Sequence, residues 1–452
     1  MRIADQNLRV HFVGIGGIGV SALARYYLAQ GARVTGSDLV KSEIVDELRD
    51  QGIMVSIGHA SGSMLPGTNL VIYSPAIKRG NPELITAREL KTKIMSYPQA
   101  LGALTKKYFT IAVSGSHGKS TTTALISLIL AEAGLDPTVI IGTKLREFNN
   151  KNFRKGESQY LVIEADEWNK SFHNYYPKVI ALTNIDKEHL DTYKNFRGVV
   201  AGFSRYLKNL PKDGVLVANW KDQEIRKLAM RLKKAKRANV IFYSKGNFKK
   251  HPLSISGAHN QINAEAAWQT ARHFGIKKSV ADKVFKSFEG AWRRMEFLGF
   301  FDEEFRIMDK TNAIQDSRFK IRVYSDYGHH PTEIKATLQA LRERYKRPRI
   351  ICIFQPHQQD RLTRLFKDFV GAFDAADAVI LTPVYKVAGR EEKSGTDSFA
   401  LAQTIKRHKS EVFFAPDFDA AIKTLRSAAR AGDVAVFMSA GDLDSQLRKF
   451  LF

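Results

Sequence analysis

The residues best suited to chemistry form a loop, Gly115 to Thr121, with the sequence GSHGKST. Glycines followed by a lysine and a hydroxyl residue are typical of P-loops, whose backbone N–H groups and lysine bind nucleotide phosphates. We predict that Lys119 contacts the β- and γ-phosphates of ATP and that the Ser120 hydroxyl binds Mg²⁺. The loop departs from the common pattern, because Val113 stands where a first glycine is expected. The predicted ATP-binding residues of the loop are Gly115, Ser116, His117, Gly118, Lys119, Ser120 and Thr121.

Acidic residues follow the next apolar segment, which ends at Ile163 and continues as Glu164-Ala165-Asp166-Glu167. A carboxylate at this position can reach a Mg²⁺ ion beside the phosphate loop, and we assign that role to Glu164. His189 lies in the later segment NIDKEHLD and is a candidate second metal ligand, although a single histidine is as often an ordinary polar residue. The predicted metal ligands are Ser120, Glu164 and His189.

A second glycine loop, GIGGIG, lies between an apolar run and a helical pattern near the N-terminus. Glycines in this position let a diphosphate approach the N-terminus of the following helix. Asp38 ends the next apolar run, where an acid commonly binds a ribose hydroxyl. By itself this arrangement indicates a dehydrogenase, although the same fold binds other nucleotides. The glycines concerned are Gly14, Gly16, Gly17 and Gly19.

Histidines and an arginine follow two apolar runs in the last third of the chain. The segment from Asp326 to Glu333 reads DYGHHPTE, and the segment from Gln355 to Arg361 reads QPHQQDR. We expect them at neighbouring strand ends, where His330 and Arg361 can bind one carboxylate. Helix capping explains each segment equally well when it is taken singly.

Three blocks of the chain repeat one pattern, in which a β-rich apolar run is followed by a polar or glycine turn and an amphipathic helix. This alternation predicts an α/β fold with mostly parallel sheets covered by helices. The predicted domains are residues 1–102, 103–295 and 296–452. The expected strands are 10–13, 33–35, 70–73, 108–113, 160–163, 179–183, 322–325, 349–354, 378–381 and 434–438, and the expected helices include 21–30 and 120–133.

The composition is that of a globular protein, with 452 residues, 44% of them hydrophobic. A single cysteine excludes an internal disulfide and favours the cytoplasm, and the longest apolar run is too short to cross a membrane. The formal net charge of +24 permits a nucleic-acid partner. We expect none, because the basic residues are spread along the chain like those of a solvated surface.

The motifs together, in their order along the chain, resemble those of the Mur ligase family. The resemblance covers nearly the whole chain through GIGGIG, GSHGKSTT, EADE, TNIDKEHLDTY, GAHNQINAEAA, FEGAWRRMEF, DYGHHPTEI, FQPH and SAGDL. It implies an N-terminal Rossmann-like domain for a UDP-sugar, a central P-loop ATPase-like domain and a C-terminal Rossmann-like domain for an amino acid. It assigns the first glycine loop, with Asp38 and Ser74, to the UDP-sugar. It also implies nucleotide contacts by Asn263 and Arg294 and a ribose contact by Asp326.

The resemblance implies an ATP-dependent amide-bond-forming ligase of peptidoglycan precursor synthesis. ATP would convert a carboxylate to an acyl phosphate, which the amine of an amino acid then attacks, with Mg²⁺ neutralising the phosphates. The most similar branch joins L-alanine to UDP-N-acetylmuramate, and its relative that attaches a tripeptide is the alternative. The residues implied as catalytic are Lys119, Glu164, His189 and His330, and those implied to bind the amino acid are His330 and Arg361.

Several features of the chain bear on the choice of branch. Residues 199–206 contain no lysine, which disfavours the sibling ligases that use a carbamylated lysine there. Only Trp168 to Lys178 separates EADE from the next strand, so the insertion of the tripeptide relative is missing. Gln358, where alanine-adding enzymes usually have a basic residue, and Trp168-Asn169-Lys170 depart from the pattern. Outside the family, an NAD-dependent oxidoreductase and a nucleic-acid-binding ATPase each explain only one of the two glycine loops.

Overall fold

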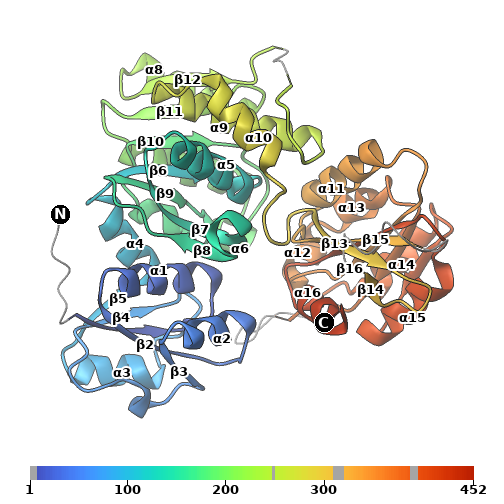
Figure 1. Cartoon of the computed structure of the whole chain (residues 1–452), viewed down its shortest axis with the longest axis horizontal. Coiled ribbons are helices and arrows are strands. Elements are labelled where there is room, and N and C mark those ends of the chain that lie inside the picture. Colours follow the sequence, from blue (N-terminus) through green and yellow to red (C-terminus); the bar gives the residue numbers. More distant parts are fainter. Residues whose placement is uncertain (1–7, 247–249, 309–319, 387–394, 452) are drawn as a thin grey trace. The chain divides into compact units, whose positions relative to one another are not determined.

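The computed structural model of the chain describes residues 8–246, 250–308, 320–386 and 395–451. They form three sheets with helices packed on them (Figure 1). The first two sheets belong to one compact unit, Met1–Leu253 with Ile262–Phe288, and the third belongs to a second unit, Ser254–Gln261 with Glu289–Phe452. Among the described residues no helix is both long and apolar enough to cross a membrane.

The first sheet is fully parallel and has the strand order β3-β2-β1-β4-β5. The order reverses next to β1, so the loops after β1 and β4 meet at a switch point where this type of sheet binds ligands. Its strands are β1 (Arg9–Val13), β2 (Arg33–Asp38), β3 (Met54–Ile57), β4 (Leu70–Tyr73) and β5 (Lys93–Ser96). Its helices are α1 (Ile18–Ala29), α2 (Glu43–Asp50), α3 (Pro82–Glu89) and α4 (Tyr97–Thr105).

The second sheet has the order β12-β11-β10-β6-β9-β7-β8 and is parallel except for the edge strand β8. Its strands are β6 (Phe109–Ser114), β7 (Thr138–Leu145), β8 (Lys151–Arg154), β9 (Tyr160–Glu164), β10 (Val179–Leu182), β11 (Val215–Asn219) and β12 (Asn239–Tyr243). The helical segments are α5 (Lys119–Glu132), η3 (Trp168–Asn174), α6 (Leu190–Tyr193), α7 (Phe196–Tyr206), α8 (Gln223–Lys234), α9 (Ala258–His273) and α10 (Lys278–Ser287). The α5 helix is buried along most of its length, because it packs against β6, β7 and β9 of this sheet.

Helix α1 packs on β1 and β2 of the first sheet and also contacts β7 and β8 of the second sheet (Figure 1). It therefore joins the two sheets of the first unit. Polar contacts add to this packing. The buried Arg25 guanidinium donates to Asn152, and Asn152 donates to the Ile18 carbonyl over 2.6 Å. Lys144 of β7 bonds Glu43 of α2 over 2.7 Å. The glycine loop that begins α1 is therefore held firmly against the second sheet.

The third sheet has the order β14-β13-β15-β19-β16-β17-β18, with β13 and β14 antiparallel to their neighbours. Its strands are β13 (Glu296–Phe301), β14 (Ile307–Met308), β15 (Ile321–Asp326), β16 (Ile350–Phe354), β17 (Ala378–Leu381), β18 (Val412–Phe414) and β19 (Val434–Met438). Its helices are α11 (Pro331–Arg344), α12 (Gln359–Arg364), α13 (Phe366–Val370), α14 (Ser398–Lys406), α15 (Phe418–Ala428) and α16 (Leu443–Leu451).

One expectation about this sheet is wrong. We expected the segments after β15 and β16 at neighbouring strand ends, but β19 pairs with both strands and separates them. The long crossover that brings the last strand back into the middle of a parallel sheet leaves no local mark in the sequence. The segment after β19, which opens with Ser439, therefore lies between the two expected halves of the site.

The α/β class with three mostly parallel sheets is confirmed, as are all ten expected strands. The main local difference is that α1 begins at Ile18 and so follows the glycine loop directly. The strands that the sequence pattern missed are mostly short or lie near sheet edges, where fewer side chains are buried. The domain boundaries at residues 102 and 295 stay a prediction.

Candidate active site

The P-loop connects the end of β6 to the start of α5, as the sequence predicts. Gly118 precedes the helix with a φ of 79°, a conformation that favours glycine. A side chain at Gly118 would also collide with the amide of Asn263, which is buried against the loop. The structure therefore brings Asn263 of α9 to the phosphate loop, where the family resemblance had implied a nucleotide contact.

The segment after β10 supports the loop from the other side. The Asn184 side chain accepts a hydrogen bond from the His117 backbone N–H over 2.8 Å and donates to the His117 carbonyl over 2.9 Å. Asp186 donates its backbone N–H to the Ser116 hydroxyl over 2.9 Å and lies 3.0 Å from the His117 ring nitrogen. Our sequence analysis missed Asn184, and its position at the end of a buried strand was the only available signal.

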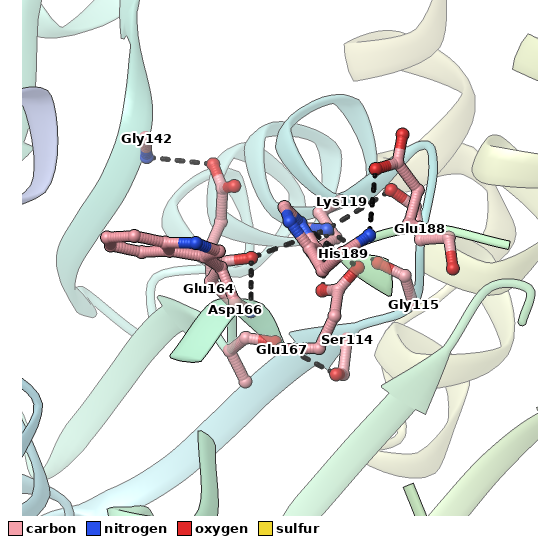
Figure 2. Close-up of polar contacts among 12 residues, drawn as sticks. Ser114, Gly115, Lys119, Gly142, Glu164, Asp166, Glu167, Glu188 and His189 are labelled. Atoms are coloured by element: carbon pink, nitrogen blue, oxygen red, sulfur yellow. Dashed lines mark hydrogen bonds and ion pairs between the residues drawn. The ribbon is translucent and has the colours of Figure 1, made fainter. Parts of the chain in front are cut away.

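Lys119 lies at the centre of the site (Figure 2). Its ammonium donates to the carbonyls of Gly115 over 2.7 Å and Ser116 over 3.2 Å, and to the carboxylate of Glu167 over 2.9 Å. Burial alone would lower the pKa of Lys119, but the carboxylates, with Glu167 foremost, outweigh burial and raise it. Lys119 is therefore a fixed positive charge beside the loop.

Ser120 and Glu164, two of the three predicted metal ligands, are in contact. The Ser120 hydroxyl donates to one Glu164 oxygen over 3.2 Å. The backbone N–H of Gly142 donates to the other oxygen over 2.8 Å (Figure 2). The two ligands come from the start of α5 and the end of β9, which are adjacent because β6 and β9 pair. Their oxygen atoms are of the type that Mg²⁺ prefers.

His189, the third predicted ligand, lies with two acids that we had not assigned. One potential ligand atom each from Asp166, Glu167 and His189 lies within 4.8 Å of the others. Among the described residues the buried Oε1 of Glu167 has no hydrogen-bond partner, and it lies 3.8 Å from the His189 ring. A buried carboxylate oxygen without a donor is costly, so these residues fit a divalent cation at this point.

The first glycine loop lies between β1 and α1, close to the predicted partners. The Gly16 backbone N–H donates to Asp38 over 2.8 Å, and an added Cβ at Gly14 would lie 3.0 Å from Ser74. Asp38, which we expected to bind a ribose hydroxyl, thus holds the loop. The N-cap of α1, Gly17, provides no capping side chain, so the first N–H groups of the helix are open to an anion.

In the second unit Arg294 precedes β13, Asp326 ends β15, and His330 and Arg361 follow β15 and β16. Asp326 is buried, and its carboxylate accepts from the backbone N–H groups of Met295 over 2.8 Å and Gly328 over 2.7 Å. Arg294 lies 3.4 Å from Glu333, and His330 caps α11 by accepting from the Thr332 N–H over 3.3 Å.

Arg361 forms a group with two other histidines of this unit. Its guanidinium donates to the His357 carbonyl over 3.2 Å, and the His357 ring packs edge-on against His329. His329 is therefore a neighbour of this group that our sequence analysis did not assign. The sequence DYGHHPTE was the signal, but it does not tell which of the two histidines faces the next segment.

Comparisons with known proteins agree with this geometry. Residues 9–109 match the profile "Mur ligase family, catalytic domain", residues 113–269 the "Mur ligase middle domain" and residues 311–441 the "Mur ligase, glutamate ligase domain". A UDP-N-acetylmuramate–L-alanine ligase of Caldanaerobacter subterraneus is 36% identical, with 98% of this chain and 97% of the relative covered. The enzyme of the same name from Aquifex aeolicus is 34% identical, with 98% and 97% covered.

Solved structures show the same architecture. A UDP-N-acetylmuramate-alanine ligase from Thermotoga maritima has a TM-score of 0.78 at 26% identity, with 98% of each chain covered. A murein peptide ligase from Psychrobacter arcticus has a TM-score of 0.70 at 22% identity, also with 98% of each chain covered, and shows the fold alone. With matches of this extent in all three parts, the chain belongs to the Mur ligase family.

Proposed function

We propose that this protein joins the carboxylate of UDP-N-acetylmuramate to the amine of L-alanine at the expense of ATP. The observation that carries the proposal is the site around Lys119, where a P-loop, the three carboxylates of Glu164, Asp166 and Glu167, and His189 meet in the first unit. The relatives of similar length that are named UDP-N-acetylmuramate–L-alanine ligases support the choice of substrates.

The first half-reaction is phosphoryl transfer. An oxygen of the substrate carboxylate attacks the γ-phosphorus of ATP, the bond from that phosphorus to the bridging oxygen breaks, and ADP leaves an acyl phosphate behind. Lys119 would hold the transferring phosphoryl group, and the N–H groups of Gly118, Lys119 and Ser120 at the start of α5 would bind the remaining phosphates. Asn263, which packs on Gly118, would contact the nucleotide.

Mg²⁺ is part of the proposal, since its role is to neutralise the phosphates and the charge that develops on them. Ser120 and Glu164 would hold one ion through oxygen atoms that already face each other. His189 would hold a second ion, with Asp166 and Glu167 as the acidic partners within reach.

The second half-reaction forms the amide bond. The amine attacks the acyl carbon, inorganic phosphate leaves, and the nitrogen loses a proton. His330 and Arg361 of the second unit would bind the amino acid, and Arg361 offers a planar fork that matches a carboxylate. Arg294 and Asp326 would contact the nucleotide and its ribose.

The first glycine loop would bind the UDP-sugar. The open N-terminus of α1 suits a diphosphate, with Gly14, Gly16 and Gly17 before the helix and Gly19 in its first turn. Ser74 and Asp38 border this loop. We place the reaction in the cytoplasm, where ATP and nucleotide sugars are available, and expect neither a nucleic acid nor a membrane as a partner.

The attachment of a whole tripeptide to the same UDP-sugar is the second candidate, because the murein peptide ligase shares the fold over the full chain. Phosphate release should be measured with UDP-N-acetylmuramate, ATP and Mg²⁺ in the presence of alanine, serine, glycine or the tripeptide. We expect alanine to give the highest kcat/KM, with the amide product confirmed by mass spectrometry. Preferred use of the tripeptide would overturn the choice of acceptor and leave the ligase class intact.

A further inference from the structure

Tyr97 is the first residue of α4, the helix that lies between the first two sheets (Figure 1). Its side chain meets the first glycine loop directly. A Cβ added at Gly19, in the first turn of α1, would lie 2.8 Å from the Tyr97 hydroxyl oxygen and 3.0 Å from the ring carbon that carries it. The phenol thus occupies the space beside the helix end where the diphosphate of the UDP-sugar is expected.

The same phenol lies within the electrostatic influence of two acids of the ATP site. Burial raises the pKa of Tyr97, and the carboxylates of Glu164 and Asp166 raise it further. Tyr97 therefore stays protonated at neutral pH and can donate a hydrogen bond. Among the described residues its hydroxyl has no hydrogen-bond partner, so its proton is available to a ligand.

The local structure gives Tyr97 little freedom. It follows β5 directly, and the side chain of Gln99 accepts the Ser96 backbone N–H over 2.9 Å at the start of α4. Further along, α4 approaches η3 so closely that a side chain at Gly102 would collide with the Asn174 carbonyl. A hydrogen bond of 3.0 Å from the Tyr176 backbone N–H to Thr105 closes the contact. Since η3 follows Asp166 and Glu167 in the chain, α4 packs against the segment that comes directly after these acids.

We propose that the Tyr97 hydroxyl donates a hydrogen bond to the diphosphate of the UDP-sugar where the sugar leaves the N-terminus of α1. This inference rests on the proposed function. The substrate must reach from the glycine loop to the γ-phosphate beside Lys119. Tyr97 touches the start of α1 and is influenced by the charges of Glu164 and Asp166. It would hold the sugar so that its carboxylate reaches the γ-phosphate beside Lys119, which is a role in substrate binding and not in proton transfer.

The test is Tyr97→Phe, which removes the hydroxyl and keeps the ring. We expect the Kd and KM for UDP-N-acetylmuramate to rise roughly 10- to 100-fold, which corresponds to the loss of one hydrogen bond to a charged group. The KM values for ATP and L-alanine should stay within about twofold, and kcat should change little. Tyr176→Phe is the matched control, because its exposed ring packs with Lys106 away from the site.

A second variant, Gly19→Ala, tests the contact itself. It should weaken binding of the UDP-sugar. The effect of Gly19→Ala should be smaller in the Tyr97→Phe background, because the hydroxyl oxygen nearest to the added Cβ is then absent. Normal binding of UDP-N-acetylmuramate by Tyr97→Phe, or an equal rise of all three KM values, would overturn this inference alone. If the unaltered chain failed to bind UDP-N-acetylmuramate in calorimetry, the proposed function would fall and this inference with it.

Discussion

The ammonium of Lys119 lies 2.9 Å from the carboxylate of Glu167, whose side chain has no exposed surface. The same carboxylate has its second oxygen 3.8 Å from the ring of His189. Glu167 therefore links the predicted phosphate-binding lysine to the predicted metal-binding histidine. Two separate sequence motifs become one site through this side chain.

Glu167→Gln should expose this link in the Mg²⁺ dependence of the reaction. The amide keeps the shape of the side chain but removes its charge, so the concentration of Mg²⁺ needed for half-maximal activity should rise by about tenfold or more. Glu157→Gln, at an exposed position between β8 and β9, is the matched control. An unchanged Mg²⁺ titration would show that Glu167 serves only to hold Lys119.

Lys119→Ala and Glu164→Ala should each lower the rate of ligation roughly a hundredfold or more, because each removes one preorganised charge at the phosphoryl group. Binding of the UDP-sugar, measured by calorimetry, should persist because the first glycine loop is untouched. Lys155→Ala, which removes an exposed lysine, should behave like the unaltered chain. Near-normal turnover in both active-site variants contradicts the assignment of the ATP site.

A bulky residue at Gly16 should weaken binding of the UDP-sugar more than binding of ATP. A Cβ there would lie 2.9 Å from a carboxylate oxygen of Asp38 and 3.1 Å from Val45, so Gly16→Val should displace the loop. Gly62→Val is a suitable control, since an added Cβ meets nothing within 4 Å. Calorimetry with UDP-N-acetylmuramate and with NAD checks the prediction, and tight binding of NAD alone would contradict it.

Arg361→Ala should raise the KM for L-alanine much more than the KM for the UDP-sugar. A lost guanidinium–carboxylate pair in a buried setting commonly costs about 2 kcal/mol or more, or roughly 30-fold. Arg364→Ala on the same helix removes an exposed guanidinium that pairs with Asp360 and should have little effect. Similar changes in both KM values would show that Arg361 does not hold the amino acid.

His259 should make the second unit less stable in acid. Burial, opposed by Glu333 and assisted by Arg294, lowers its pKa from 6.5 to about 4, so the ring is neutral in the folded protein. Unfolded chains take up the proton near pH 6.5, and the contribution of the neutral ring is full above that pH. As the pH falls from about 6.5 toward 4, this contribution of His259 to the free energy of unfolding is lost, and the loss amounts to roughly 1 to 3 kcal/mol.

This pH dependence can be measured as the urea midpoint at pH 7.5 and pH 5. Between pH 7.5 and pH 5 the urea midpoint of the unaltered chain should fall more than that of His259→Gln, because the variant has no ring to protonate. Parallel losses in the two proteins would assign the acid sensitivity to other groups.

The α/β class and both glycine loops could be predicted from the sequence, because they depend on local patterns. Apolar runs, turn glycines and amphipathic helices follow one another along the chain, and the P-loop needs only Gly118 before the helix and Lys119 at its start. The pairing of Ser120 with Glu164 was also predictable, since parallel strands end at one edge of a sheet.

Tertiary structure decided which of several adjacent residues face the site. Glu164 and Glu167 belong to one short motif, yet the turn of the chain after β9 directs one toward Ser120 and the other toward Lys119. The insertion of β19 between β15 and β16 has no sequence mark, because strand order depends on packing between distant segments. Tyr97 carries no motif at all, and only the approach of α4 to the start of α1 brings its hydroxyl next to Gly19.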